Sequence, residues 1–243
     1  MFYNYNIRPY IVLNGVNSRS INGLLISELA PISKPAQRVQ EEQIDGRDGD
    51  IITPLGFAAY DKVVKIGLTY DFKIDDIIEF FNSSGKVVFS NEPDKYYFYS
   101  IYEQIDFERL IRFRTAEVTF HVQPFKYSDT EKEQTFNLSG SNSEIQIRNN
   151  GNIYSRPTLT ITGSGDINFY LNGSQLLTLE LGLATRTIII DCNEMNAYSS
   201  DGNLLNRLVS GDYDKIRLKV GNNTLNFVGT VNQVVINDYS RWI

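Results

Sequence analysis

The sequence predicts a mainly β protein with two domains, and three observations support this. The chain has 243 residues, which exceeds the usual size of a single domain. It contains 15 Tyr and 14 Phe residues, and these side chains, together with the many Ile, Val and Thr residues, favour strands. Apolar and polar residues also alternate over long runs, which is the pattern of a strand with one buried face.

The first half of the chain contains several strand-like runs and one helical segment. Residues 60–70 alternate between apolar and polar positions, which predicts a strand. Residues 74–85 instead predict one short amphipathic helix, with acidic side chains in its first turns and Gly85 as its end. The apolar residues of this segment recur at helical spacing, at Ile74, Ile77, Ile78 and Phe81. Three further strands are expected at residues 86–90, 95–102 and 112–122, and Pro124 is expected to end the last one.

The segment 127–134 is polar and charged, which places the predicted domain boundary near residue 128. Beyond it, many short strands at close spacing predict a β-sandwich. These strands are expected at residues 144–148, 158–162, 166–171, 175–181, 187–191, 215–220, 224–228 and 233–236. The pair Asn172–Gly173 between two alternating runs indicates a type I′ hairpin turn. The pair Gly163 and Gly165 is interpreted as a turn, because no helix follows it.

Charge and composition exclude several classes of protein. The chain has 23 basic and 29 acidic residues, and its net charge of -6 argues against nucleic-acid binding. No apolar run reaches the roughly 20 residues of a membrane span, and the start of the chain lacks the pattern of a signal peptide. The single cysteine, Cys192, excludes an internal disulfide framework and a multi-cysteine zinc site.

The sequence contains no recognisable catalytic or metal-binding constellation, so no enzyme activity and no cofactor are predicted. His121, the only histidine, is expected on the polar face of a strand, and Cys192 is expected to be a small buried residue. The segment 45–50 lacks the acidic spacing of a calcium loop, and a Gly-rich hairpin tip is the favoured interpretation. An acid pair among Asp75, Asp76 and Glu79 is conceivable, but the polar face of a helix has the same pattern.

Several local strings, in their order and spacing, resemble the distal tail proteins (Dit) of long-tailed phages that infect Gram-positive bacteria. The resemblance covers nearly the whole chain. It rests on Leu13–Gly15 with Gly23–Leu24, Ile44–Asp50, Val118–Tyr127, Asn149–Pro157, Ile190–Tyr198 and Tyr239–Ile243. The chain lacks the long insertions of larger members, so their extra carbohydrate-binding modules are not expected.

The resemblance implies an N-terminal β-barrel-like domain, residues 1–127, that closes six copies into a ring, and a C-terminal galectin-like sandwich, residues 128–243. The last residues of the chain are expected to pack down, with the domain junction as one possible place. The resemblance also implies a place at the virion tail tip after assembly in the host cytoplasm. The implied partners are further copies of the chain, the tail tube protein, a tail-associated lysin or tail-tip protein, and receptor-binding proteins. No membrane partner and no specific nucleic-acid binding are implied.

Two surfaces are predicted to serve this ring. Residues 37–70 have the pattern of a long hairpin that contacts a neighbouring copy. Its expected tip, Gly46, Arg47, Asp48 and Gly49, is the candidate interface, and a free turn is an equal alternative.

DNA must pass the bore of the ring without being held, so the lining is expected to be neutral or acidic. Asp75, Asp76 and Glu79 are candidates for that lining, although an outward, solvated helix face is the commoner arrangement.

A carbohydrate-binding sandwich that recognises cell-wall glycan is the competing function. Sandwich folds often bind sugars, and aromatic side chains can stack against sugar rings. The candidate platforms are Tyr170, Tyr198, Tyr213 and Trp242. Aromatic residues of β-rich chains are more often part of the core.

Overall fold

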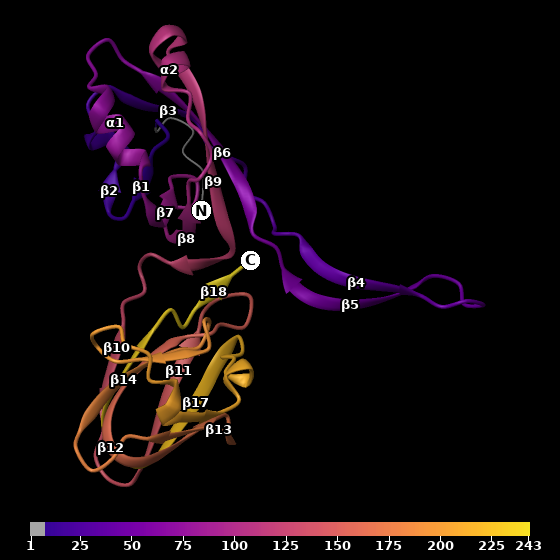
Figure 1. The fold of residues 1–243 in the computed structure, drawn as a ribbon, viewed down its shortest axis with the longest axis vertical. Coiled ribbons are helices and arrows are strands. Elements are labelled where there is room, and N and C mark those ends of the chain that lie inside the picture. Colours follow the sequence, from indigo (N-terminus) through magenta and orange to yellow (C-terminus); the bar gives the residue numbers. More distant parts are fainter. Residues whose placement is uncertain (1–7) are drawn as a thin grey trace. The chain divides into compact units, whose positions relative to one another are not determined.

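The structure is a computed structural model, and it describes residues 8–243. The described chain separates into two compact units, residues 8–130 and residues 131–242. Both units are built from strands, as Figure 1 shows, so the predicted mainly β class is confirmed. Within the described residues, no helix is long and apolar enough to cross a membrane.

The N-terminal unit contains the first nine strands and both α-helices of residues 8–243. The strands are β1 (Ile11–Leu13), β2 (Val16–Asn17), β3 (Leu24–Glu28), β4 (Gln37–Gln43), β5 (Asp50–Phe57), β6 (Tyr60–Leu68), β7 (Ser84–Phe89), β8 (Lys95–Ser100) and β9 (Thr115–Ser128). The helices are α1 (Ile74–Phe81) and α2 (Phe107–Phe113). Seven of the strands form one antiparallel sheet in the order β2-β1-β7-β8-β9-β6-β3, and β4 with β5 forms a separate ribbon.

Strand β9 of the N-terminal unit pairs with different strands along its length. Its first half pairs with β6 from Gly67 and Thr115 onward, and its second half pairs with β8 up to Ser128. The register against β8 shifts near Pro124, which has no backbone N–H to donate. The prediction that Pro124 ends the strand is therefore wrong, because the irregular pairing absorbs the proline and the strand continues.

The two helices correct the predicted single helix. Helix α1 ends at Phe81, and Gly85 lies in β7 with a φ of +138° rather than at a helix end. Phe80 is buried and Ile78 is exposed, so Phe80 takes the inward position that Ile78 was expected to occupy. Helix α2 covers residues predicted partly as strand, and the Asp106 side chain caps it by accepting a hydrogen bond from the Arg109 N–H. Both helices bury apolar side chains in the core of this unit.

The C-terminal unit is a sandwich in which two long strands belong to both layers. Its strands are β10 (Gln134–Asn137), β11 (Asn142–Asn149), β12 (Thr158–Leu171), β13 (Ser174–Glu180), β14 (Arg186–Asp191), β15 (Asn196–Tyr198), β16 (Val209–Gly211), β17 (Gly221–Asn237) and β18 (Arg241–Trp242). One layer has the order β10-β17-β12-β14-β15, and the other has the order β11-β17-β12-β13-β16. Strands β12 and β17 were each predicted as two shorter strands because both bend midway.

Glycines permit the bend where β12 and β17 cross between layers. A Cβ on Gly163 would lie 2.4 Å from the carbonyl oxygen of Thr230, and a Cβ on Gly229 would lie 2.4 Å from that of Asp166. The interpretation of Gly163 and Gly165 as a turn is therefore corrected to an irregularity within one strand.

The other local predictions in this unit have mixed outcomes. The Asn172–Gly173 turn is confirmed, with φ values of +51° and +87°. The strand predicted at 215–220 is absent, and a 3-10 turn at Tyr213–Lys215 precedes an irregular segment there. Strands β10, β15 and β16 are short and were not predicted.

Candidate functional site

The ribbon of β4 and β5 projects from the N-terminal unit, and no other strand of residues 8–243 pairs with it (Figure 1). Its register runs from the pair Gln37 and Phe57 to the pair Gln43 and Asp50. The four candidate interface residues Gly46, Arg47, Asp48 and Gly49 lie at its tip, where both glycines have positive φ. The hairpin therefore ends at Phe57 and not at residue 70, because β6 belongs to the main sheet.

Both faces of this hairpin expose apolar side chains. Ile52 is 60% exposed and Leu55 is 54% exposed, and Ile44 beside the tip is also exposed. Ile52 lies opposite Glu41, and the adjacent, partly exposed Ile51 lies on the other face, while Leu55 is the extra residue where the register shifts. A two-stranded ribbon with no cover on either face is marginally stable in water. These side chains are therefore suited to burial against another surface.

The hairpin is also acidic. Five acidic side chains, Glu41, Glu42, Asp45, Asp48 and Asp50, stand against two basic ones, Arg38 and Arg47, and all seven are exposed. Within the described part of the chain, Arg47 and Asp48 form no ion pair. Their charged groups are thus available to a neighbouring molecule.

Several contacts hold the base of the hairpin against the sheet. The Ala58 N–H donates to the Ala36 carbonyl oxygen at 2.8 Å, which closes the base. The Phe57 ring meets the Phe125 ring edge to face at 5.5 Å between centroids. The segment that leads into β4 is held at Ala30, whose carbonyl oxygen accepts a hydrogen bond from Asn91 Nδ2 at 3.0 Å.

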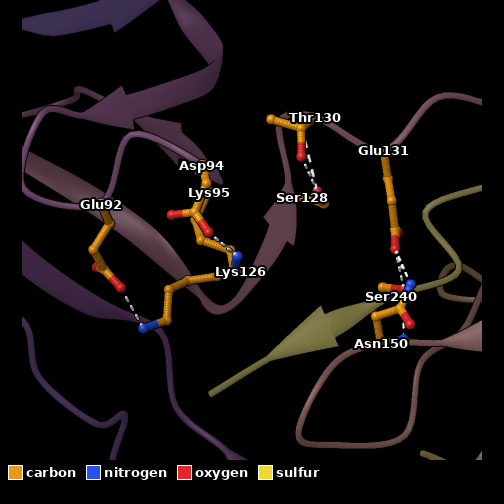
Figure 2. Close-up of polar contacts among 9 residues, drawn as sticks. All are labelled: Glu92, Asp94, Lys95, Lys126, Ser128, Thr130, Glu131, Asn150 and Ser240. Atoms are coloured by element: carbon orange, nitrogen blue, oxygen red, sulfur yellow. Dashed lines mark hydrogen bonds and ion pairs between the residues drawn. The ribbon is translucent and has the colours of Figure 1, made fainter. Parts of the chain in front are cut away.

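A buried polar cluster lies next to this base. Lys126 Nζ is 2.7 Å from Glu92 Oε1, and the side chains are only 9% and 13% exposed (Figure 2). The Tyr97 hydroxyl donates to the other oxygen, Glu92 Oε2, at 2.8 Å. Lys62 also belongs to this cluster, and its Nζ donates a hydrogen bond to the Pro31 carbonyl oxygen at 3.0 Å.

Burial dominates the acid–base properties of this cluster. It lowers the pKa of Lys62 to about 8, against the opposite effect of the nearby Glu92 carboxylate, while Lys126 lowers it further. Burial and the Glu92 charge raise the pKa of Tyr97 well above its usual value. The Glu92 carboxylate thus pairs with Lys126 and acts on Lys62 only through its charge.

The acidic residues of α1 are exposed side by side on one helix. Asp75 and Asp76 lie in the first turn, where the helix dipole favours negative charge, and Glu79 follows one turn later. The opposite face of the helix buries Ile77 and Phe80. This arrangement fits an exposed helix face, and it leaves the three carboxylates available to solvent or to a lining role.

The remaining sequence candidates have local structural explanations. His121 Nδ1 is 2.8 Å from Asp61 Oδ1 on the neighbouring strand, and the Tyr102 ring lies beside the imidazole. Cys192 is fully buried, and burial raises the pKa of its thiol far above the usual value, which disfavours a reactive thiolate. Among residues 8–243, no three His, Cys, Asp or Glu side chains gather as a possible metal site.

The aromatic candidates for sugar stacking are scattered over the sandwich. Tyr198 donates its hydroxyl to Glu194, and burial raises the pKa of Tyr213 to about 12. Trp242 is partly exposed in β18. Tyr170 lies on the outward side of β12, where its hydroxyl donates to Gln175 Oε1 at 3.1 Å.

The C-terminal segment packs down by way of Tyr239 in its own unit. Its side chain is 5% exposed, and its hydroxyl accepts a hydrogen bond from Gln134 Nε2. Next to it, the Ser240 hydroxyl donates to Glu131 Oε1 at 2.7 Å, and Asn150 Nδ2 donates to the same oxygen (Figure 2).

The N-terminal part of the chain matches a known family model, and nearly the whole chain is similar in fold to solved structures. Residues 18–122 match the family model of the phage tail protein RIFT-related domain. No curated protein matches the chain. Its fold is similar to the crystal structure of the phage SPP1 Dit protein, described as a paradigm of the hub adsorption apparatus in Gram-positive infecting phages. That match has 16% identity and a TM-score of 0.63, and it covers 97% of this chain and 99% of the other.

Two structures of the phage p2 baseplate in its activated conformation are also similar in fold. The calcium form matches with 11% identity and a TM-score of 0.53 and covers 98% of both chains. The strontium form matches with 11% identity and a TM-score of 0.54 and covers 94% of this chain and 97% of that one. The expected resemblance to the distal tail proteins is confirmed by the family model and by the shared fold.

Proposed function

We propose that this chain, which carries a phage tail protein domain and has the fold of a distal tail protein over nearly its whole length, is the structural hub of a phage tail tip. Six copies form a ring through the N-terminal unit. The ring joins the tail tube to the tail-tip and host-adsorption proteins and lets DNA pass. The observation that carries the proposal is the projecting hairpin of β4 and β5, whose exposed apolar side chains need a partner surface.

A closed ring requires a contact in which one patch of each subunit meets a different patch of the next. A hairpin that leaves its own domain supplies such a patch, because it brings two free strand edges and an apolar surface to a neighbour. Ile52 and Leu55 supply the apolar area, and Arg47 with Asp48 supplies charged groups at the tip. The same geometry would serve a single ring or two rings stacked face to face.

The bore of such a ring must not bind DNA tightly. Each phosphate that a basic wall neutralises adds to affinity, and a ring multiplies every contact by its number of copies. The net charge of -6 is consistent with a permissive conduit. Asp75, Asp76 and Glu79 on α1 remain the proposed acidic contribution to the lining.

The test of this proposal is the assembly state of the full chain. We expect native mass spectrometry to find a hexamer, or a multiple of it, at micromolar concentration. Leu55→Lys and Ile52→Lys should each shift the equilibrium toward monomer, because they place a charge in the buried contact. Val63→Lys is the matched control, since Val63 is an exposed apolar residue of the main sheet. A wild-type chain that stays monomeric at high concentration would refute the ring.

The charged tip is tested separately. Arg47→Ala combined with Asp48→Ala removes both charges without changing the glycines that form the turn. If the tip is part of the contact, the monomer fraction should rise, because each lost charge-assisted hydrogen bond costs about 1 to 3 kcal/mol. An unchanged hexamer in light scattering would make the tip a free turn.

A second candidate function, glycan binding by the sandwich, has one specific observation in its favour. Tyr170 is partly exposed on the outward side of the sheet, where it lies opposite Asn226 on β17. A partly exposed aromatic ring on an outer sheet face is suited to stacking against a sugar ring. Retention of the chain on cell-wall polysaccharide, lost in Tyr170→Ala and kept in Tyr198→Ala, would support this function. No retention of the wild-type chain would refute it.

A further inference from the structure

Lys62 makes an unusual contact for a lysine of a sheet. It is 2% exposed, and its ammonium lies 5.2 Å from the centre of the Tyr97 ring and 5.4 Å from that of Phe89. Such distances allow attraction between the cation and the aromatic faces. Within the described residues, the one hydrogen bond shown for its Nζ goes to the Pro31 carbonyl oxygen at 3.0 Å.

This hydrogen bond joins the two segments from which the hairpin emerges. Lys62 lies near the start of β6, which follows directly from β5 through Ala58 and Ala59. Pro31 lies in the segment between β3 and β4. One side chain therefore connects the root of β4 to the root of β5.

A buried charge is a poor way to stabilise the core at this position. The Glu92 carboxylate already pairs with Lys126 and accepts a hydrogen bond from Tyr97. Replacing a buried charge with an apolar side chain of similar volume is often neutral or stabilising. Lys62 donates a directed hydrogen bond to the hairpin root, which an apolar side chain of similar volume cannot do.

We propose that Lys62 is a positioning residue that fixes the direction of the β4–β5 hairpin by its hydrogen bond to the Pro31 carbonyl. The consequence for ring formation rests on the proposed function, but the effect on the hairpin does not. The hairpin of each copy reaches its neighbour only if its two roots are held in one arrangement. Lys62 thus acts on the ring contact without lying in it.

The experiment compares Lys62→Met with Lys65→Met in the full chain. Lys65 lies on the same strand, is exposed, and pairs with Glu28 at 2.6 Å. Hydrogen exchange of the Ala58 amide, which bonds to Ala36 at the hairpin base, reports the root. Lys62→Met should accelerate this exchange by about tenfold or more, as expected for the loss of a hydrogen bond from a charged donor. Lys65→Met should exchange like the wild type.

Assembly is measured in the same samples by sedimentation velocity. In Lys62→Met, the concentration at half assembly should rise by about tenfold or more while circular dichroism and the protection of the core strand β6 stay unchanged. Normal Ala58 protection together with normal assembly in a folded Lys62→Met protein would overturn the inference. If the wild-type chain does not assemble at all, the proposed ring fails, and the exchange result still decides the role of Lys62.

Lys62→Gln keeps the test decisive if the methionine variant does not fold. Its amide is polar but ends one bond short of the lysine nitrogen, so it should also lose the contact with Pro31. A folded Lys62→Gln protein with fast Ala58 exchange would support the positioning role. If neither variant folds, Lys62 is required for the sheet itself and the positioning role is refuted.

Discussion

The buried state of Lys62 predicts an alkaline rise in the stability of the N-terminal unit. The pKa of Lys62 falls from 10.5 to about 8 on folding because the ammonium leaves water. Between these values the unfolded chain binds more protons than the folded one, so the free energy of unfolding increases with pH. The whole difference corresponds to about 3 kcal/mol, at roughly 1.4 kcal/mol per pH unit. Between pH 8 and pH 10 this lysine alone should contribute a gain of about 2 kcal/mol.

The upper limit of this window is set by tyrosines. Burial raises the pKa of Tyr60, Tyr97 and Tyr99, so ionisation near pH 10 favours the unfolded chain and reverses the trend. Stability should therefore rise from pH 8, reach a maximum a little below pH 10 and fall above it. Well below pH 8 both states keep the lysine charged, and this group contributes no pH dependence.

Alanine methyl NMR during urea titration can measure each unit separately. Ala116 is buried in the N-terminal unit, and Ala197 is buried in the C-terminal unit. The Ala116 transition should move to higher urea between pH 8 and pH 10, whereas the Ala197 transition should not. Lys62→Met should remove the movement. A flat or falling Ala116 midpoint in the wild type, or the same rise in Lys62→Met, would refute the argument.

Three further predictions concern the buried pair, the strand crossing and the bore. Glu92→Gln should destabilise the N-terminal unit by about 3 to 5 kcal/mol in urea titrations, because it leaves Lys126 buried without its counter-ion. Glu117→Gln changes an exposed carboxylate and is the control. Equal effects of the two substitutions would contradict the role of burial. Gly229→Ala should lower the melting temperature of the C-terminal unit more than Gly202→Ala, since only the first Cβ meets a carbonyl oxygen at 2.4 Å. The assembled protein should not retain double-stranded DNA at physiological salt, and micromolar binding in a filter assay would exclude a permissive conduit.

Local sequence patterns predicted the features that depend on neighbouring residues. The alternation in β6 and the Asn172–Gly173 turn were correct because each is determined by side chains a few positions apart. Helix α2 was missed because seven residues carry too little periodicity, although Asp106 three positions before Arg109 is a capping signal. The halves of β12 and β17 were recognised, but their continuity depends on how the two strands cross.

The alternation of residues in β6 indicates that Lys62 is buried, although this was not predicted. Lys62 has the same parity as Val64 and Ile66, so the alternation itself places it on the inward side of β6. What the pattern could not show is the partner that makes this burial acceptable. Pro31 and Glu92 come from other segments, and their approach depends on the folded sheet.

The contrast between local patterns and contacts with distant segments also explains why the sequence predicted the hairpin. Its residues have few contacts with distant parts of their own chain, so local turn chemistry and strand pattern describe most of its structure. Strand β5 carries apolar residues on both faces, although nothing in its own ribbon covers them. In a protein whose other strands bury one face, two uncovered apolar faces indicate a partner outside the chain. The few contacts that the hairpin makes with its own chain, and its uncovered apolar side chains, therefore make it the strongest candidate for the assembly contact. For the same reason, only residues at its root can fix its direction.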